Sequence, residues 1–360
     1  MAEKESEDLE VDENIEEDEV LITYDIASYP SDLTLNVIKE MWENDDIVIP
    51  EFQRNFVWSI KQSSLLIESF ILALPVPQVF FYVDENNKSL VIDGQQRILS
   101  IVYYLEGYFG TESIHGKRQV FRLQGLDDRS PYAKKRFSEL DESAQRKLKF
   151  NSILRAINIR QLNPKGQNTS VYHIFERLNT GGTPLKPQEI RNCVFIGDFV
   201  GILKDLNKDK NWRKIIGKET YDKHQKDIEL ILRIFSLSEK WQEYEKPMKE
   251  YLNINMEKDR DGISGRVKRF VTLFPKATAI IIAQLGDKPF HARGPLNSAI
   301  LDSVFCTILD HLDKVPANLK DRYKELLGDS VYKEATFSST SDASVLKKRF
   351  KLVHSCLIGD

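Results

Sequence analysis

The chain has 360 residues, of which 41% are hydrophobic, enough apolar content for one large core or two smaller ones. No apolar run approaches the length of a membrane span, and no basic start leads into a signal-like apolar stretch. Cys193, Cys306 and Cys356 are widely spaced and form no C-x-x-C pair, which argues against a disulfide framework and a thiolate zinc site. We therefore expect a cytoplasmic globular protein without a membrane partner.

The charge of the chain is unevenly distributed. Residues 1–20 contain eleven Asp or Glu and a single Lys, so taking their charge of −10 from the total of −4 leaves +6 for the rest. An acidic segment with few apolar residues is typical of a disordered, self-repelling tail. The pattern also permits a tail that competes with nucleic acid for a basic face. We predict an acidic disordered tail over residues 1–20.

The first predicted elements after the tail are a helix and a short strand. Apolar residues between 33 and 42 mark the helix, and residues 47–49 mark the strand. Ser59 and Gln62 form a capping-box pattern, which predicts the start of a second helix.

A predicted β-hairpin follows. Residues 78–83 and 90–92 are apolar runs on either side of a polar turn. The helix after this hairpin repeats its apolar residues at the i, i+3, i+4, i+7 spacing of a buried face. The spacing assigns Ile98, Ile101, Val102 and Leu105 to the core.

The next part of the chain is less regular. Residues 117–149 are charged and predict a surface insertion with short helices. Residues 153–162 alternate as in a strand, with Arg155 facing either a site or solvent. A helical stripe then runs from residue 171 to residue 178, and beyond residue 195 the pattern is helical almost throughout.

The residues Asp93-Gly94-Gln95-Gln96-Arg97 stand where the hairpin passes into the helix. A strand that ends in Asp-Gly and opens a helix leaves backbone N–H groups and the positive end of the helix dipole pointing at one spot, which suits an anion. Arg97 falls in the first helical turn, where its fork of donors fits phosphate oxygens. Asp93 suits Mg²⁺, and Gln95 or Gln96 could orient water. An ordinary polar turn explains the same five residues equally well.

Two further blocks accompany this turn. Upstream, Gln53 and Arg54 form a polar pair framed by Phe52, Phe56 and Trp58, which indicates either a pocket wall or an ordinary polar break. Downstream, the helical stripe ends in a loop with two glycines, which permit positive φ or a close backbone approach. This third block consists of Arg177, Asn179, Thr180, Gly181, Gly182 and Thr183, followed by Gln188-Glu189-Ile190-Arg191-Asn192.

In this order the three blocks resemble the N-terminal domain family of GmrSD-type modification-dependent restriction endonucleases, which is named for its DGQQR motif. The resemblance covers residues 24–352, and its motif-bearing part ends near residue 195. It implies an α+β chain in which a ParB/sulfiredoxin-like mixed α/β domain over residues 21–195 precedes an all-helical domain over residues 196–360.

The resemblance also implies that the turn hydrolyses nucleoside triphosphates. The expected catalytic residues are Asp93, Gln95, Gln96 and Arg97, with Mg²⁺ held at Asp93. The expected nucleotide-binding residues are Gly94, Gln53, Arg54, Arg177, Asn179, Thr180, Gly181, Gly182 and Thr183.

One departure from the family pattern shapes the expected function. Many relatives continue into an HNH-type nuclease domain, whereas His311 is isolated here. We therefore expect a regulatory or sensing component of a bacterial anti-phage, restriction-like system, working with a separately encoded effector or nuclease and with DNA as a candidate partner. Two alternatives remain open: a DNA-binding adaptor with a non-catalytic nucleotide site, and a ParB-like nuclease.

Other motifs carry less weight. No G-x-x-x-x-G-K-[ST] stretch is present, which argues against a P-loop NTPase. The six histidines stand singly, without the spacing of a metal site. The glycines and basic residues of 262–269 lack a preceding strand and predict a linker with a solvated basic helix face.

Overall fold

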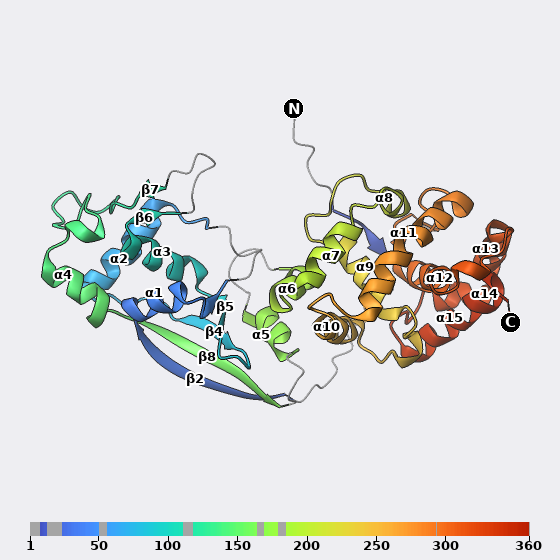
Figure 1. Ribbon diagram of the computed structural model, residues 1–360, viewed down its shortest axis with the longest axis horizontal. Helices are drawn as coiled ribbons and strands as arrows, with labels where there is room; N and C mark the ends of the chain where they lie inside the picture. The colour runs from blue at the N-terminus through green and yellow to red at the C-terminus, as the bar shows by residue number, and fades with distance from the viewer. Residues whose placement is uncertain are drawn as a thin grey trace. The chain divides into compact units, whose positions relative to one another are not determined.

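A computed structural model describes residues 8–12, 24–49, 56–110, 118–163, 169–178, 185–292 and 294–359 of the chain. These residues form two compact units (Figure 1). The sheet unit spans residues 24–184, and the helical unit runs from residue 185 onward and includes residues 8–12. The division falls ahead of the 195/196 boundary predicted from the sequence. Within the described ranges, no helix is long and apolar enough to cross a bilayer.

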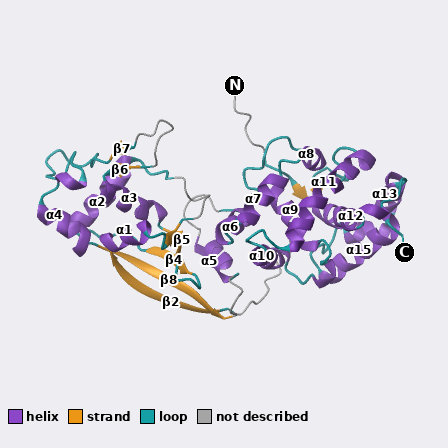
Figure 2. Cartoon of the chain, in the orientation of Figure 1, coloured by secondary structure: helices purple, strands orange, loops and turns teal. Residues whose placement is uncertain are grey.

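The sheet unit is built on a mixed five-stranded sheet with strand order β2-β8-β4-β5-β3. Strands β4 and β8, and β3 and β5, are parallel, whereas β2 with β8 and β4 with β5 are antiparallel. Figure 2 shows these strands in orange, with helices beside them. The elements of the unit are β2 (Asp25–Thr34), α1 (Leu35–Glu43), β3 (Ile47–Val48), α2 (Ile60–Leu72), β4 (Val79–Val83), β5 (Ser89–Asp93), α3 (Gln95–Glu106), β6 (Tyr108–Phe109), β7 (Gln119–Val120), α4 (Glu142–Arg146), β8 (Ile153–Asn163) and α5 (Ser170–Leu178).

Helices α1, α2 and α3 cover one face of this sheet. Their apolar stripes pack against strand residues such as Val79, Val91 and Leu154, all fully buried. Ser59 and Gln62 form the predicted capping box at the start of α2, and the predicted hairpin is confirmed as β4 and β5. The mixed α/β fold class predicted for this part of the chain is therefore confirmed.

The sequence pattern did not predict strand β2, because it predicted that Leu33 belongs to a helix. Most residues of β2 are exposed, so the strand lacks the apolar alternation that marks a half-buried strand. It also contains Pro30, which cannot donate to a ladder and is tolerated because β2 lies at the edge of the sheet.

The segment after α3 is also more than a surface insertion. Short helices are present, as predicted, but Phe121, Leu123 and Leu148 are completely buried. These side chains extend the core formed with α1–α3. Their spacing follows no single helical or strand period, so the sequence pattern did not predict their burial.

The helical unit packs its helices around a second core, in which Ile228, Ile231, Leu232 and Phe235 form the buried stripe predicted for one helix. The predominance of helix in this half is confirmed. The elements are β1 (Val11–Asp12), α6 (Pro187–Val194), α7 (Asp198–Leu206), α8 (Lys210–Ile216), α9 (Lys226–Leu237), α10 (Met248–Lys258), α11 (Gly265–Leu285), β9 (Leu296–Asn297), α12 (Ser298–Asp310), α13 (Leu319–Gly328), α14 (Ser330–Ala335) and α15 (Ala343–Leu357).

The acidic N-terminal segment contradicts the expectation of a disordered tail at residues 8–12. Leu9 is 2% exposed and belongs to the core of the helical unit. Strand β1 pairs in parallel with β9, seen as the blue arrow within the helical unit in Figure 1. Leu9 and the partly buried Val11 dock this segment together with the strand pairing, although the average composition of residues 1–20 predicted no order.

Candidate functional site

The turn between β5 and α3 is shaped by a glycine that no other residue could replace without strain. Gly94 has φ +101° and forms the N-cap of α3. A Cβ atom at Gly94 would lie 2.2 Å from Cγ1 of Val79 on the neighbouring strand. Positive φ and the close approach of β4 therefore both require glycine. A β-bulge at Phe80 and Phe81 shifts the register beside Asp93.

Arg97 is held over this turn by one end of its guanidinium group. Its Nη2 donates to Oδ2 of Asp93 at 2.8 Å and to the carbonyl of Gln78 at 3.0 Å. The Arg97 side chain is only 16% exposed, whereas the Asp93 side chain is 55% exposed. The buried Nε of Arg97 has no hydrogen-bond partner among the described residues. The guanidinium group is thus fixed in place with donor capacity left over.

The N-terminus of α3 is open towards the same turn. Among the described residues no side chain caps this helix, so the positive end of its dipole meets no capping side chain at this turn. Gln95 is 9% exposed, and its Nε2 is buried without a hydrogen-bond partner. An unpartnered buried amide costs free energy, so native structures rarely keep one without a reason.

Gln96 has a different role from Gln95. Its Oε1 accepts hydrogen bonds from the backbone N–H groups of Val57 and Trp58, at 3.0 and 3.1 Å. This carboxamide therefore ties the chain ahead of α2 to the start of α3. The bond brings the end of the upstream block to the turn, while Gln53 and Arg54 lie outside the described residues.

The third block divides between the two units. Arg177 is exposed in the last turn of α5, and α5 contacts β5, the strand that ends in Asp93. Residues 179–183, which contain the predicted binding loop, lie outside the described residues. The rest of the block forms α6 of the helical unit.

Arg191 on α6 is 1% exposed and belongs to a structural network. It donates to Glu229, Asn253 and Gln188 at 2.6, 2.9 and 3.2 Å. The sequence pattern gave no sign that this arginine would be enclosed in a core.

Metal-binding groups are sparse in the parts of the chain that the structure describes. No three His, Cys, Asp or Glu side chains gather there at metal-ligand distances. The rings of His311 and His354 meet edge to face with centroids 4.8 Å apart, so these two histidines are neighbours although they stand far apart in the sequence. Asp93 could contribute one carboxylate to a cation whose other ligands are phosphate oxygens and water, the arrangement that Mg²⁺ favours.

Arg155, whose direction the sequence left open, faces solvent. Its Nε and Nη2 donate to the two carboxylate oxygens of Asp32 on β2. These hydrogen bonds hold the pKa of Asp32 below its usual value. Arg155 is therefore a cross-strand partner of Asp32.

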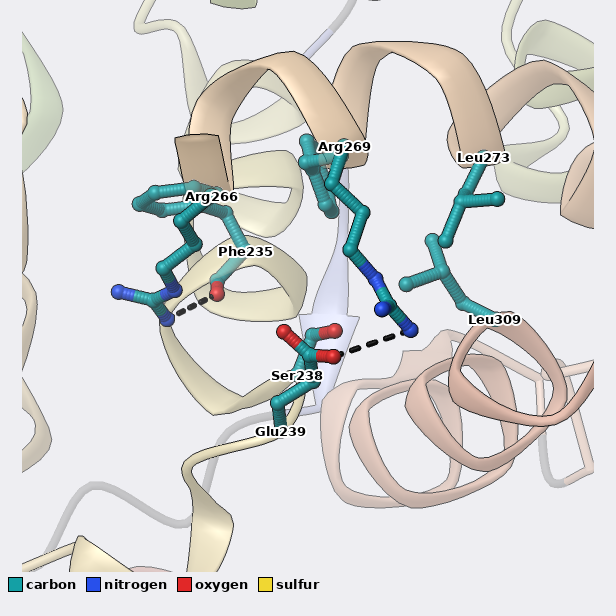
Figure 3. A pocket seen from close by; sticks show the side chains of 8 residues that line it. Phe235, Ser238, Glu239, Arg266, Arg269, Leu273 and Leu309 are labelled. Atoms are coloured by element: carbon teal, nitrogen blue, oxygen red, sulfur yellow. Dashed lines mark hydrogen bonds and ion pairs between the residues drawn. The ribbon is translucent and has the colours of Figure 1, made fainter. Parts of the chain in front are cut away.

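The prediction of a solvated basic helix face at residues 262–269 is wrong for Arg266. Arg266 does not lie on a solvated face, because it donates to Asn255 and its guanidinium stacks on the ring of Phe235, 4.2 Å away. Burial lowers the pKa of Arg266. Figure 3 shows the adjoining hollow, where Arg269 is paired with Glu239 at 3.0 Å. The hollow has room for about one water molecule.

The fold and the turn together define a class of protein: a mixed sheet unit with an uncapped helix N-terminus and an anchored arginine at one turn, joined to a helical unit. Residues 35–196 match the family model described as the GmrSD restriction endonuclease, N-terminal domain. This match confirms the predicted resemblance to that domain family. The domain suggests a component of a restriction-like, phage-defence system. No match was found among curated proteins.

Proposed function

We propose that the Asp93–Arg97 turn binds the phosphate chain of a nucleoside triphosphate and hydrolyses it, and that this reaction regulates a restriction-like defence system. The observation that carries the proposal is the pair of buried, unpartnered donors, Nε2 of Gln95 and Nε of Arg97, beside the uncapped start of α3. Donors left unsatisfied at a helix N-terminus suit an anionic ligand.

Each residue of the turn has a distinct role in this proposal. Arg97 neutralises charge on the phosphate oxygens, since phosphoryl transfer depends mainly on positioning and charge stabilisation. The positive end of the α3 dipole attracts the same phosphates. Gln95 holds phosphate or the attacking water, and Gln96 keeps residues 57–58 against the helix. Gly94 allows the backbone to approach so closely.

Asp93 would hold Mg²⁺ together with the nucleotide. Its Oδ2 accepts from Arg97, and its Oδ1 has no hydrogen bond among the described residues. Bound Mg²⁺ supplies charge neutralisation between neighbouring phosphates. A phosphate that takes over Nη2 of Arg97 would release Oδ2 of Asp93, so nucleotide and cation are expected to bind cooperatively.

A DNA-binding adaptor that holds a nucleotide without hydrolysing it is the second candidate. It is favoured by the bond from Arg97 to Asp93, because this bond already engages one oxygen of the one carboxylate of the turn. In that case the turn would act as a switch whose state follows nucleotide occupancy alone.

Phosphate release from ATP, GTP, CTP and UTP, with and without Mg²⁺, tests the proposal. We expect Mg²⁺-dependent turnover that Asp93→Ala reduces by about 100-fold or more, because one preorganised charge contact is lost. Asp32→Ala is the matched control, since it removes an exposed carboxylate of the same sheet that pairs with a different arginine. Tight nucleotide binding without turnover would select the adaptor. Wild-type turnover by Asp93→Ala would contradict the assigned site.

A further inference from the structure

The helical unit has several positively charged stretches, one of which includes α8 and the start of α9. Residues 24–184 contain nineteen acidic and nineteen basic side chains, so the excess of +6 outside the acidic N-terminus belongs to residues 185–360. Residues 204–226 contain eight basic and four acidic side chains, a net charge of +4. This stretch is the one that the acidic N-terminus contacts through Lys223 and Lys226.

The connection between α8 and α9 has a fixed conformation. Arg213 donates through Nε to the carbonyl of Lys218 at 2.9 Å and through Nη1 to Asp227 at 2.7 Å. Its guanidinium lies 5.1 Å from the ring centroid of Tyr221, which is 55% exposed. An exposed aromatic ring among basic side chains is typical of surfaces that bind nucleic acid. We name Lys214, Lys218, Tyr221, Lys223 and Lys226 the α8–α9 surface.

The acidic N-terminal segment is docked on this surface. Asp8 pairs with Lys223 at 3.3 Å, and Lys226 donates through Nζ to the carbonyl of Leu9 at 3.2 Å. The N–H of Leu9 donates to Asp222 at 2.7 Å. Two lysines that would otherwise face solvent are thus engaged by a carboxylate and a carbonyl of the N-terminus.

We propose that the α8–α9 surface binds the phosphate backbone of nucleic acid, and that residues 8–12 cover it as an intramolecular competitor. The inference rests on the proposed restriction-like role, which requires contact with DNA. A segment flanked by acidic residues offers lysines the same negative charge as a phosphate backbone. Docking through one buried leucine and a two-residue strand makes a small contact that a polyanion can displace.

The shape of the contact favours nucleic acid over a partner peptide. A peptide would have to take over both the β9 edge and the Leu9 site, which residues 8–12 already fill. Nucleic acid needs only the exposed lysines and Tyr221. Because each lysine freed for phosphate releases about one counterion, uncovering Lys223 and Lys226 should steepen the salt dependence of binding by about two ions.

Leu9→Asp tests this inference, because it places a charge in the leucine site and so detaches the segment. Binding of a fluorescent DNA duplex is measured across a salt series for the full-length protein, with circular dichroism as the check on folding. We expect about tenfold tighter binding at low salt and the steeper slope. Lys223→Glu combined with Leu9→Asp should remove the gain, whereas Lys320→Glu with Lys324→Glu on α13 should preserve it.

Asp8→Asn provides a second variant that keeps Leu9 and removes only the carboxylate that pairs with Lys223. We expect a gain of about threefold. Unchanged DNA affinity and salt slope in both Leu9→Asp and Asp8→Asn would overturn the inference. Self-association without a gain in DNA affinity would assign the surface to a second copy of the chain and would also overturn it. Phosphate release without DNA reports separately on the proposed hydrolysis, so failure of one proposal is distinguishable from failure of the other.

Discussion

Arg191 in the helical unit and Arg97 in the sheet unit differ in how many of their guanidinium donors are hydrogen-bonded to the protein. Arg191 in the helical unit is 1% exposed and donates to Glu229, Asn253 and Gln188. Arg97 in the sheet unit is also largely buried, but within the described part of the chain its Nη2 donates to Asp93 and Gln78 while its Nε has no partner. The same residue type is saturated at one position and left with spare donors at the other.

Under the proposed function, this difference separates a structural arginine from a ligand-binding one. A buried guanidinium with all its donors engaged stabilises the protein and offers a ligand nothing. A buried donor without a partner costs free energy in the unliganded protein, and a ligand that satisfies it recovers that cost. Under this view Arg191 supports the fold, and Arg97 supports the chemistry.

The largest expected effect is on stability at Arg191. Arg191→Ala leaves Glu229 without its buried partner, so we expect a loss of about 3–5 kcal/mol in the free energy of unfolding. Urea denaturation measures this change. Arg155→Ala, which breaks an exposed pair, should leave the unfolding midpoint unchanged. Equal, small effects of the two substitutions would break the comparison.

The next effect concerns the docked N-terminal segment. Leu9→Ala removes an apolar side chain from the helical core, and we expect it to lower the free energy of unfolding by about 2 kcal/mol. The value lies at the low end for core leucines because a short segment can detach instead of leaving a cavity. Leu72→Ala, at a position 52% exposed, is the control. An unchanged midpoint for Leu9→Ala would show that the segment contributes nothing to the core.

The two glutamines of the turn sharpen the comparison further. Gln96→Met removes the acceptor for two backbone N–H groups and should cost about 1 kcal/mol of stability. Gln95→Met removes a buried amide whose Nε2 is unpartnered, so stability should stay within about 0.5 kcal/mol while hydrolysis falls. Thermal denaturation and phosphate release, measured on both variants, would contradict this account if the two effects were reversed.

The sequence predicted the fold best where one local signal dominated. The capping box at Ser59, the hairpin before Asp93 and the apolar stripe of α9 all depend on residues close together in the chain, and the structure contains each of them. Strand β2 was not predicted, because an exposed edge strand with a proline has no apolar period. Its pairing with β8 joins residues that are between 119 and 138 positions apart in the chain.

The sequence predicted which residues form the turn of the candidate site, but it did not predict the contacts that these residues make with other strands and loops. The motif placed Asp93, Gly94 and Arg97 at a strand-to-helix turn, and the structure places them there. Nothing local to the motif indicated that Val79 would crowd Gly94 or that the carbonyl of Gln78 would hold Arg97. The different roles of Gln95 and Gln96 likewise depend on a segment almost forty residues earlier in the chain.

The most direct test of the central claim compares Arg97→Ala with Arg191→Ala in two measurements on the same preparations, phosphate release and the free energy of unfolding. The account predicts that Arg97→Ala lowers turnover by about 100-fold or more with little loss of stability, and that Arg97→Lys is also poor because an ammonium cannot reproduce the guanidinium fork. Arg191→Ala should show the opposite pattern, with a large loss of stability. Wild-type turnover in a folded Arg97→Ala protein would contradict the account.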